Sequence, residues 1–260
     1  MTKEEFRELM NSVCPEDLAE DWDNSGFQIA VSDGRKYGRC IYVALDITDR
    51  VIRNASAIGA DTVVTHHPLF FDPLKTVSYD EPSGRYAVDL IRKGISVYSC
   101  HTNFDRMAGG MNDEIGRLLG VKEINIAGED GYARCGDLPE PMAFDVFCGH
   151  VAKCLGLDAH TFRLAGRAPQ KVKRVCWCGG AGAEFASGMK NTGSDIFVTG
   201  DLKYHTAKEA AERGLTILDI GHFGSEKCFV GRMTELLMEN MPEGTEVYQH
   251  LIDEDCWKQL

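Results

Sequence analysis

Segments with the pattern of buried strands alternate with segments of helical spacing along most of this 260-residue chain. CIYVALDIT (40–48) is rich in apolar and β-branched residues, which predicts a buried strand, and residues 49–60 follow it with helical spacing. This alternation is typical of a mostly parallel sheet covered by helices, so the predicted fold class is α/β. The same half of the chain has further predicted strands at 61–71 and 95–102 and predicted helices at 86–94 and 112–120.

The second half of the chain follows the same alternation. The stretch between the halves, 127–145, contains several glycines and prolines and has no long period, so we expect a loop there. We therefore expect two α/β domains, 1–127 and 128–260, with mostly parallel or mixed sheets and a metal cleft between them at the strand ends. The C-terminal segment is free to pack back onto the first domain and to contribute metal ligands. Strands are predicted at 171–180, 195–201 and 215–221, and helices at 144–157, 182–193, 204–214 and 226–241.

Composition narrows the classes of function. The net charge of −12 argues against sequence-independent binding to nucleic acid, which needs a basic surface. No apolar run approaches the ~18–20 residues of a membrane span, and the amphipathic start of the chain is unlike a secretory signal, so we expect a cytoplasmic protein with no membrane partner. The basic segment 163–174 is either a solvated linker face or a local grip on a phosphate-bearing ligand.

Four stretches place histidine or carboxylate just beyond a predicted strand, where open parallel sheets bind ligands. In FVTGDLKYH the simpler interpretation of Asp201 is a helix N-cap. In LDIGHFGSE a helix that starts near His222 puts Glu226 on the same face, one turn later, so both can reach one ion. The other two stretches are VVTHHP, with His66 and His67, and SCHTNFD, with His101 and Asp105. His205 lies in the same stretch as Asp201.

These stretches together supply five candidate metal ligands. Three imidazoles and two carboxylates suit zinc, iron, manganese, cobalt or nickel. Five ligands exceed the three that a mononuclear catalytic zinc uses, so two divalent ions fit the number better. His101 and His205 are then candidates for outer-sphere or proton-transfer roles. The five candidate ligands are His66, His67, Asp105, His222 and Glu226.

The motifs WDNSGFQIA, THHPLFF, HTNFDRMAGGMND, VTGDLKYHTAKEA and DIGHFGSE occur here in that order. In this the chain resembles the Nif-three-like dinuclear-metal proteins, which also carry the name GTP cyclohydrolase 1 type 2 homologues. The resemblance implies two α/β domains, a metal pair in a cleft and a homohexameric ring. It also implies that His66 and Asp105 serve one ion, that His67 and His222 serve the other, and that Glu226 bridges both. Phe27 and Ser225 stand where the family has leucine and threonine.

Two further segments are candidates for binding a substrate. Asp23 and Asn24 lie in WDNSG, which is either a simple turn or, as the resemblance suggests, part of the cleft lining. Gly179 and Gly180 begin GGAGAEF, which is either a tight strand-to-helix turn or a backbone cradle for a phosphate group.

The expected function is a dinuclear metal-dependent hydrolase, GTP cyclohydrolase 1 type 2-like, which uses a metal-activated water on a nucleotide or phosphorylated substrate. Two alternatives stay open at this point. One is a metal-dependent phosphoesterase, and the other is a non-catalytic metal-binding scaffold or a metal-insertion or regulatory protein. The ligand set does not separate the three.

Overall fold

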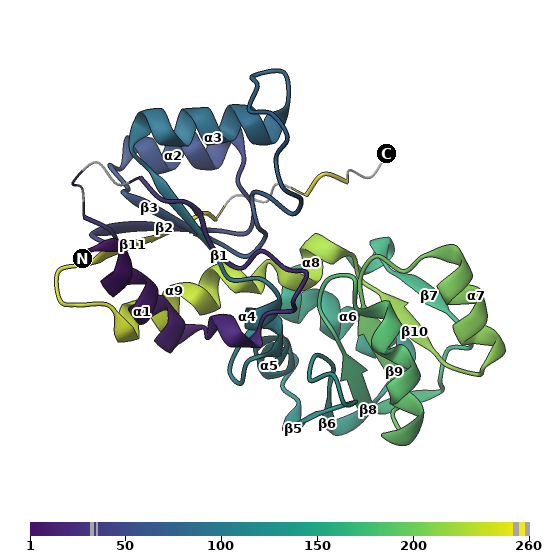
Figure 1. Cartoon of the computed structure of the whole chain (residues 1–260). Helices are drawn as coiled ribbons and strands as arrows, with labels where there is room; N and C mark the ends of the chain where they lie inside the picture. The colour runs from purple at the N-terminus through teal and green to yellow at the C-terminus, as the bar shows by residue number, and fades with distance from the viewer. Residues whose placement is uncertain (32–33, 35, 252–254, 258–260) are drawn as a thin grey trace. The chain divides into compact units, whose positions relative to one another are not determined.

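The chain divides into two compact units, shown in Figure 1. The first comprises Met1–Met107 and Phe229–Ile252, and the second comprises Ala108–Cys228 and Asp253–Leu260. The division after Met107 precedes the expected boundary at residue 127, and the segment from Phe229 returns to the first unit. The computed structural model describes residues 1–31, 34, 36–251 and 255–257.

A five-stranded sheet forms the centre of the first unit, in the order β1-β4-β3-β2-β11. The four strands from β4 to β11 run parallel, and only β1 pairs antiparallel, against β4. Every residue of β2, β3 and β4 is buried, including the threonines and serines that begin and end β3 and β4, as expected for parallel strands covered on both faces. The strands are β1 (Gly26–Ile29), β2 (Cys40–Ala44), β3 (Thr62–Thr65), β4 (Ser96–Ser99) and β11 (Glu246–Gln249).

Helices cover both faces of this sheet, as Figure 1 shows. α2 (Asp49–Ala57) and α3 (Pro82–Lys93) lie side by side on one face, and α1 (Lys3–Val13) and α9 (Cys228–Asn240) lie on the other. A capping box between Thr2 and Glu5 starts α1, and Phe6 of this helix is fully buried, with its ring nearly perpendicular to that of Tyr98. The short segments η1 (Glu16–Leu18) and α4 (Thr102–Arg106) contact each other.

The second unit contains a six-stranded mixed sheet in the order β5-β6-β8-β9-β10-β7. β8, β9 and β10 run parallel in its middle, and antiparallel pairs flank them. α5 (Met111–Leu118) and α6 (Phe144–Leu155) contact each other; α5 also contacts β5 and β6, and α6 contacts β6 and β8. α7 (Tyr204–Glu212) contacts β7 and the 3₁₀ helix η3 (Gly182–Asn191). The strands are β5 (Lys122–Ile126), β6 (Arg134–Ala143), β7 (Arg163–Ala165), β8 (Lys171–Trp177), β9 (Ile196–Thr199) and β10 (Ile217–Asp219).

The predicted α/β class is confirmed, but the predicted loop at 127–145 is wrong. Most of that stretch is β6, which pairs with β5 and β8. Its pairing with β8 is interrupted between Asp137 and Met142, and Pro139 and Pro141 lie in the interruption, where no ladder N–H is required. The expected helix at 182–193 is the 3₁₀ helix η3, and β11 was not expected. No helix in the described part of the chain is long and apolar enough to cross a membrane.

The close approach of α5 to β8 gives a testable consequence for stability. A Cβ atom on Gly116 of α5 would lie 2.4 Å from the ring of Trp177, whereas a Cβ on Gly149 of α6 would meet nothing within 4 Å. We expect Gly116→Ala to lower the free energy of unfolding by about 1–3 kcal/mol, because the core must shift to admit the methyl group. Gly149→Ala is the matched control, and it should raise the free energy of unfolding by roughly 0.5–1 kcal/mol through helix propensity. Urea denaturation measures both, and equal effects of the two variants would contradict the packing described here.

Candidate metal centre

Three neighbouring strands of the first unit end in potential metal ligands or their supports. Asp46 follows β2, His66 and His67 follow β3 directly, and His101 follows β4. Because these strands run parallel, their carboxyl ends lie at the same edge of the sheet. The ring centroids of the three histidines are 4.8–5.7 Å apart. The fold of this unit therefore gathers the three imidazoles into one group.

Each of these histidines uses its Nδ1 atom to bond the protein. His66 Nδ1 lies 2.8 Å from the carbonyl oxygen of Cys100, and His67 Nδ1 lies 2.8 Å from Asp46 Oδ1. His101 Nδ1 lies 2.7 Å from Asp23 Oδ1. Carbonyl and carboxylate oxygens only accept, so Nδ1 carries the proton and donates it in each case. In their neutral form these rings therefore carry the lone pair on Nε2, which is the nitrogen that commonly ligates protein-bound metals when Nδ1–H is anchored.

One ligand atom from each of His66, His67 and His101 can be chosen so that all three lie within 4.8 Å of one another. Asp105, in the short helix α4, adds a carboxylate whose Oδ1 is 3.6 Å from His66 Nε2. His66 is fully buried, with its ring against Phe229 at a centroid distance of 5.2 Å. An apolar wall behind a histidine limits its rotation, so the donor atoms of this group are held in place.

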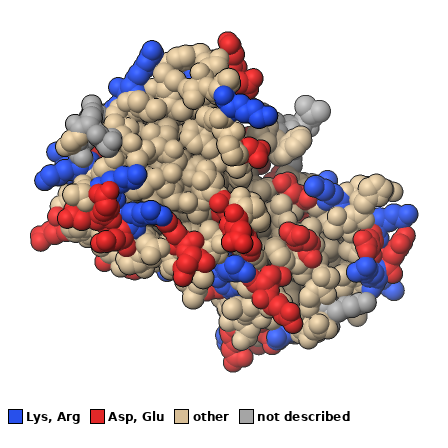
Figure 2. Space-filling model, in the orientation of Figure 1, with Lys and Arg blue, Asp and Glu red and all other residues tan. Residues whose placement is uncertain are grey.

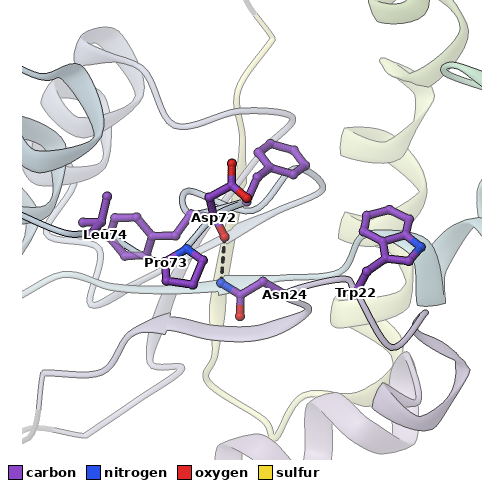
Figure 3. A pocket seen from close by; sticks show the side chains of 7 residues that line it. Trp22, Asn24, Asp72, Pro73 and Leu74 are labelled. Atoms are coloured by element: carbon purple, nitrogen blue, oxygen red, sulfur yellow. Dashed lines mark hydrogen bonds between the residues drawn. The ribbon is translucent and has the colours of Figure 1, made fainter.

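Asp23 was predicted to bind a substrate, and the structure places it behind His101. Its carboxylate is fully buried and also accepts hydrogen bonds from Thr102 and Ser25. Burial alone would raise the pKa of Asp23, but the hydrogen bonds from His101, Thr102 and Ser25 outweigh it and hold the pKa well below its usual range. Asp23 is thus a permanent anion that orients the His101 ring. Its neighbour Asn24 lines a surface hollow described below (Figure 3).

The second unit contains a histidine–carboxylate pair at the equivalent edge of its own sheet. Asp201 follows β9 and His222 follows β10, and these strands run parallel. His222 begins α8 (His222–Glu226), and its Nε2 atom is 2.9 Å from Glu226 Oε2. His222 Nδ1 lies 2.8 Å from Asp201 Oδ2, so this histidine has the same Nδ1 anchor as the other three. Asp201 is therefore not the helix N-cap that the sequence favoured; Lys203 occupies that position.

Gly179 and Gly180 were candidates either for a tight strand-to-helix turn or for a phosphate cradle, and the structure shows their N–H groups engaged within the protein. Gly179 N donates to Asn112 Oδ1 and Gly180 N donates to Ser225 Oγ, both at 2.9 Å. Gly180 instead makes room for a candidate ligand. A Cβ atom there would lie 2.1 Å from Glu226 Oε1, and its φ of +60° also favours glycine. The glycine pair thus positions the Glu226 carboxylate.

Asp219 at the end of β10 holds the two loops of this group together. Its carboxylate accepts hydrogen bonds from the backbone N–H of Leu202 at 3.2 Å and of Gly221 at 3.0 Å. Arg163 on the edge strand β7 pairs with the same carboxylate. Asp219 therefore fixes the backbone on which Asp201 and His222 are carried.

Two other candidates from the sequence, His205 and the basic segment 163–174, lie outside both groups of potential ligands. His205 lies exposed in the first turn of α7, with its ring against Tyr204, and it belongs to none of the metal-capable groups found among the described residues. The basic segment 163–174 forms β7 and β8, where Arg163 pairs with Asp219 and Arg174 pairs with Asp137. On the face drawn in Figure 2, Lys and Arg side chains are interspersed with Asp and Glu. Together with the net charge of −12, this gives no support to nucleic-acid binding.

Sequence reasoning missed Asp46 as part of the site. Its signal was available, because Asp46 follows a buried strand just as the histidines do. Chain position alone, however, did not show that it would meet His67, which follows the neighbouring strand. Asp201 was noticed but assigned a local capping role, since its contact with His222 depends on the parallel register of β9 and β10.

The donor chemistry of both groups fits divalent cations. Imidazole nitrogen and carboxylate oxygen are the ligands that zinc and related ions prefer. With Nδ1–H donated to Asp201, neutral His222 has a lone pair on Nε2, so its approach to Glu226 brings two acceptors together. A shared proton or a cation is required to make that approach favourable. The outer carboxylates Asp23, Asp46 and Asp201 match the carboxylate–histidine–metal arrangement of known sites.

The anchoring of His67 predicts a measurable effect on metal affinity. Asp46→Ala removes the acceptor for Nδ1–H and frees the ring to rotate, so we expect affinity for zinc or manganese to fall roughly 10- to 100-fold. Glu8→Ala is the matched control, because Glu8 is an exposed carboxylate of the same unit. Calorimetric titration of each full-length variant gives the affinities. An Asp46→Ala protein that binds metal as tightly as the control would show that the anchor has no such role.

Comparison with known proteins shows the family of this chain. The model of the family Duf34/NIF3 (NGG1p interacting factor 3) matches residues 1–255. A Clostridium perfringens protein named GTP cyclohydrolase 1 type 2 homolog is 33% identical over 244 residues, with 92% of each chain covered. A Helicobacter pylori protein named GTP cyclohydrolase 1 type 2 is 33% identical over 238 residues, with 90% of each covered. A solved Bacillus cereus protein related to NIF3 has the same fold, with a TM-score of 0.91 at 23% identity and 99% of each chain covered. The chain therefore belongs to the Duf34/NIF3 family.

Proposed function

We propose that this protein is a metal-dependent hydrolase that acts on a nucleotide or another phosphorylated substrate. The observation that carries the proposal is the shared anchoring of four histidines. Each donates its Nδ1–H to a carboxylate or carbonyl, and this leaves Nε2 as the ligand atom. A metal ligand needs one ring nitrogen free of a proton, and an anchored Nδ1–H on each ring provides this at Nε2, whereas purely structural histidines have no reason to share one tautomer.

We propose that the two groups serve one pair of ions, as the family resemblance implies. His66, His67 and Asp105 would be the ligands from the first unit, and His222 and Glu226 those from the second. Three imidazoles and two carboxylates are a suitable donor set for two such ions. Divalent ions at such a site supply Lewis acidity, which lowers the pKa of water and stabilises negative charge that develops on the reacting group.

The surrounding residues have separate tasks in this proposal. Asp46, Asp23 and Asp201 accept the Nδ1–H groups of His67, His101 and His222 and so fix these imidazole rings. His101 thus combines an oriented ring with an Nε2 atom that can bind an ion or transfer a proton. We place His101 in the site on this basis, with Asp23 as its positioning residue.

The names of the relatives favour one reaction among the possible hydrolyses. Proteins 33% identical to this chain carry the name GTP cyclohydrolase 1 type 2 or its homolog. Hydrolytic opening of the imidazole ring of a purine nucleotide leaves a formamide, and a second hydrolysis of that formamide releases formate, whereas hydrolysis of a phosphate ester releases phosphate only. We propose the ring-opening reaction first, and the phosphoesterase reaction is the alternative that the same assay detects. The homohexameric ring stays a prediction, which light scattering of the purified chain can check.

The proposal is tested by metal content and turnover in the same preparations. We expect about two ions per chain after loading with zinc, manganese or iron, and formate release from GTP that stops on chelation and returns with metal. Glu226→Ala should lose at least one ion and the activity, because one of the five proposed ligands is removed. Glu239→Ala, an exposed glutamate of α9, is the matched control and should keep both.

Each other result has a definite meaning. Release of phosphate without formate would identify the phosphoesterase. Two bound ions without turnover over a broad nucleotide panel would replace the hydrolase with a non-catalytic metal-binding or metal-insertion role. A chain that binds no metal under these conditions would contradict the proposal altogether.

A further inference from the structure

A hollow of about 460 Å³ lies in the surface of the first unit, next to the histidine group. Its lining comes from Trp22, Asn24 and the segment 70–74 that follows His66 and His67 in the chain. Figure 3 shows Trp22 on one side of the hollow and Pro73 and Leu74 on the other, with Asn24 between them. The volume falls in the range of small-molecule sites.

Hydrogen bonds tie the two walls of the hollow together. Asn24 Nδ2 donates to the carbonyl oxygen of Phe70 at 2.7 Å and to Gln28 Oε1 at 3.0 Å. Gln28 Oε1 also accepts from the backbone N–H of Phe70 at 3.3 Å. The Trp22 segment is anchored further by Asp23, which bonds His101 and Thr102. The hollow is therefore bounded by a cross-linked frame rather than by two independent loops.

Aromatic rings connect this hollow directly to the histidines. The Phe71 ring is 5.5 Å from the His101 ring and 6.3 Å from the His67 ring, measured between centroids. The Trp22 ring is 6.2 Å from the His101 ring in an edge-on arrangement. A molecule held in the hollow would thus have one end beside the imidazoles that we assign to metal binding or proton transfer.

The lining selects for one class of ligand. Trp22 and Phe71 are 66% and 55% exposed, and two large exposed apolar rings that line the same hollow are typical of a ligand-binding surface. Asp72 is exposed and makes no hydrogen bond or ion pair with the described residues. The side-chain NH2 group of Asn24 donates to Gln28 and Phe70, so its Oδ1 atom can accept a hydrogen bond from a ligand. No lysine or arginine is among the described residues that line the hollow. These features favour a flat ring with N–H groups and disfavour phosphate.

We infer that this hollow binds the planar heterocycle of the substrate by stacking against Trp22 and Phe71, with ring N–H groups donating to Asp72 and Asn24. The inference rests on the proposed function only in calling the bound molecule a substrate, and binding of the heterocycle can be measured without turnover. The phosphate groups of a nucleotide would then lie outside the hollow. This makes Trp22 and Asp72 specificity-determining residues of the site.

The experiment measures binding of three probes to the metal-loaded full chain by calorimetry. Guanosine has a flat ring with N–H donors, caffeine has a flat purine ring without them, and sodium tripolyphosphate has only the phosphate chain. We expect guanosine to bind, caffeine to bind roughly tenfold more weakly, and binding of tripolyphosphate to be indifferent to Trp22. Trp22→Ala should weaken guanosine binding at least about tenfold, whereas Trp22→Phe keeps most of it. Asp72→Ala should remove the preference for guanosine over caffeine.

Trp257→Ala is the matched control, because Trp257 is 82% exposed and is not among the residues that line the hollow. The inference is overturned if Trp22→Ala and Trp257→Ala bind guanosine equally well, or if caffeine binds as tightly as guanosine in the wild type. Metal content is measured on the same samples. If the wild-type chain holds its metal but does not bind guanosine, the inference about the hollow is rejected and the proposed function is not. If the wild-type chain binds no metal, the proposed function is rejected instead.

Discussion

The donation of histidine Nδ1–H groups to fixed oxygen atoms is the interaction on which the candidate centre depends. An imidazole that can rotate or change tautomer is a poor metal ligand, because either nitrogen can hold the proton. In this chain Asp46, Asp23, Asp201 and the carbonyl of Cys100 each take one Nδ1–H. Deleting such an oxygen is therefore expected to weaken metal binding without touching a ligand.

In both units, parallel strands place these acceptor oxygen atoms next to the histidines. Parallel strands end at a common edge, so a residue after one strand meets a residue after the next. His67 meets Asp46 in this way across β3 and β2, and His222 meets Asp201 across β10 and β9. Backbone constraints complete the arrangement in the second unit, where only a glycine at position 180 leaves space for the Glu226 carboxylate. The site is thus a product of sheet register as much as of residue type.

Much of this was readable from the sequence, since strand and helix periods identified the α/β class and the residues beyond the strands identified the candidate ligands. The failures share a cause, which is dependence on contacts between segments distant in the chain. Asp46 and Asp201 gained their roles only from neighbouring strands, and β6 was hidden by prolines that fall where its pairing is interrupted. For Gly179 and Gly180 the sequence left a tight turn and a phosphate cradle open, because the partners of their N–H groups, Asn112 and Ser225, lie far away in the chain. His101 was placed outside the ligand set, yet it lies within the group of three imidazoles.

The most direct test of the account is an anomalous-difference map from crystals of the metal-loaded full chain. The account predicts peaks about 2.0–2.2 Å from the Nε2 atoms of His66, His67 and His222, with the Nδ1–H bonds to Cys100, Asp46 and Asp201 intact. Peaks elsewhere, or ligation through Nδ1 with these acceptor oxygen atoms displaced, would contradict it.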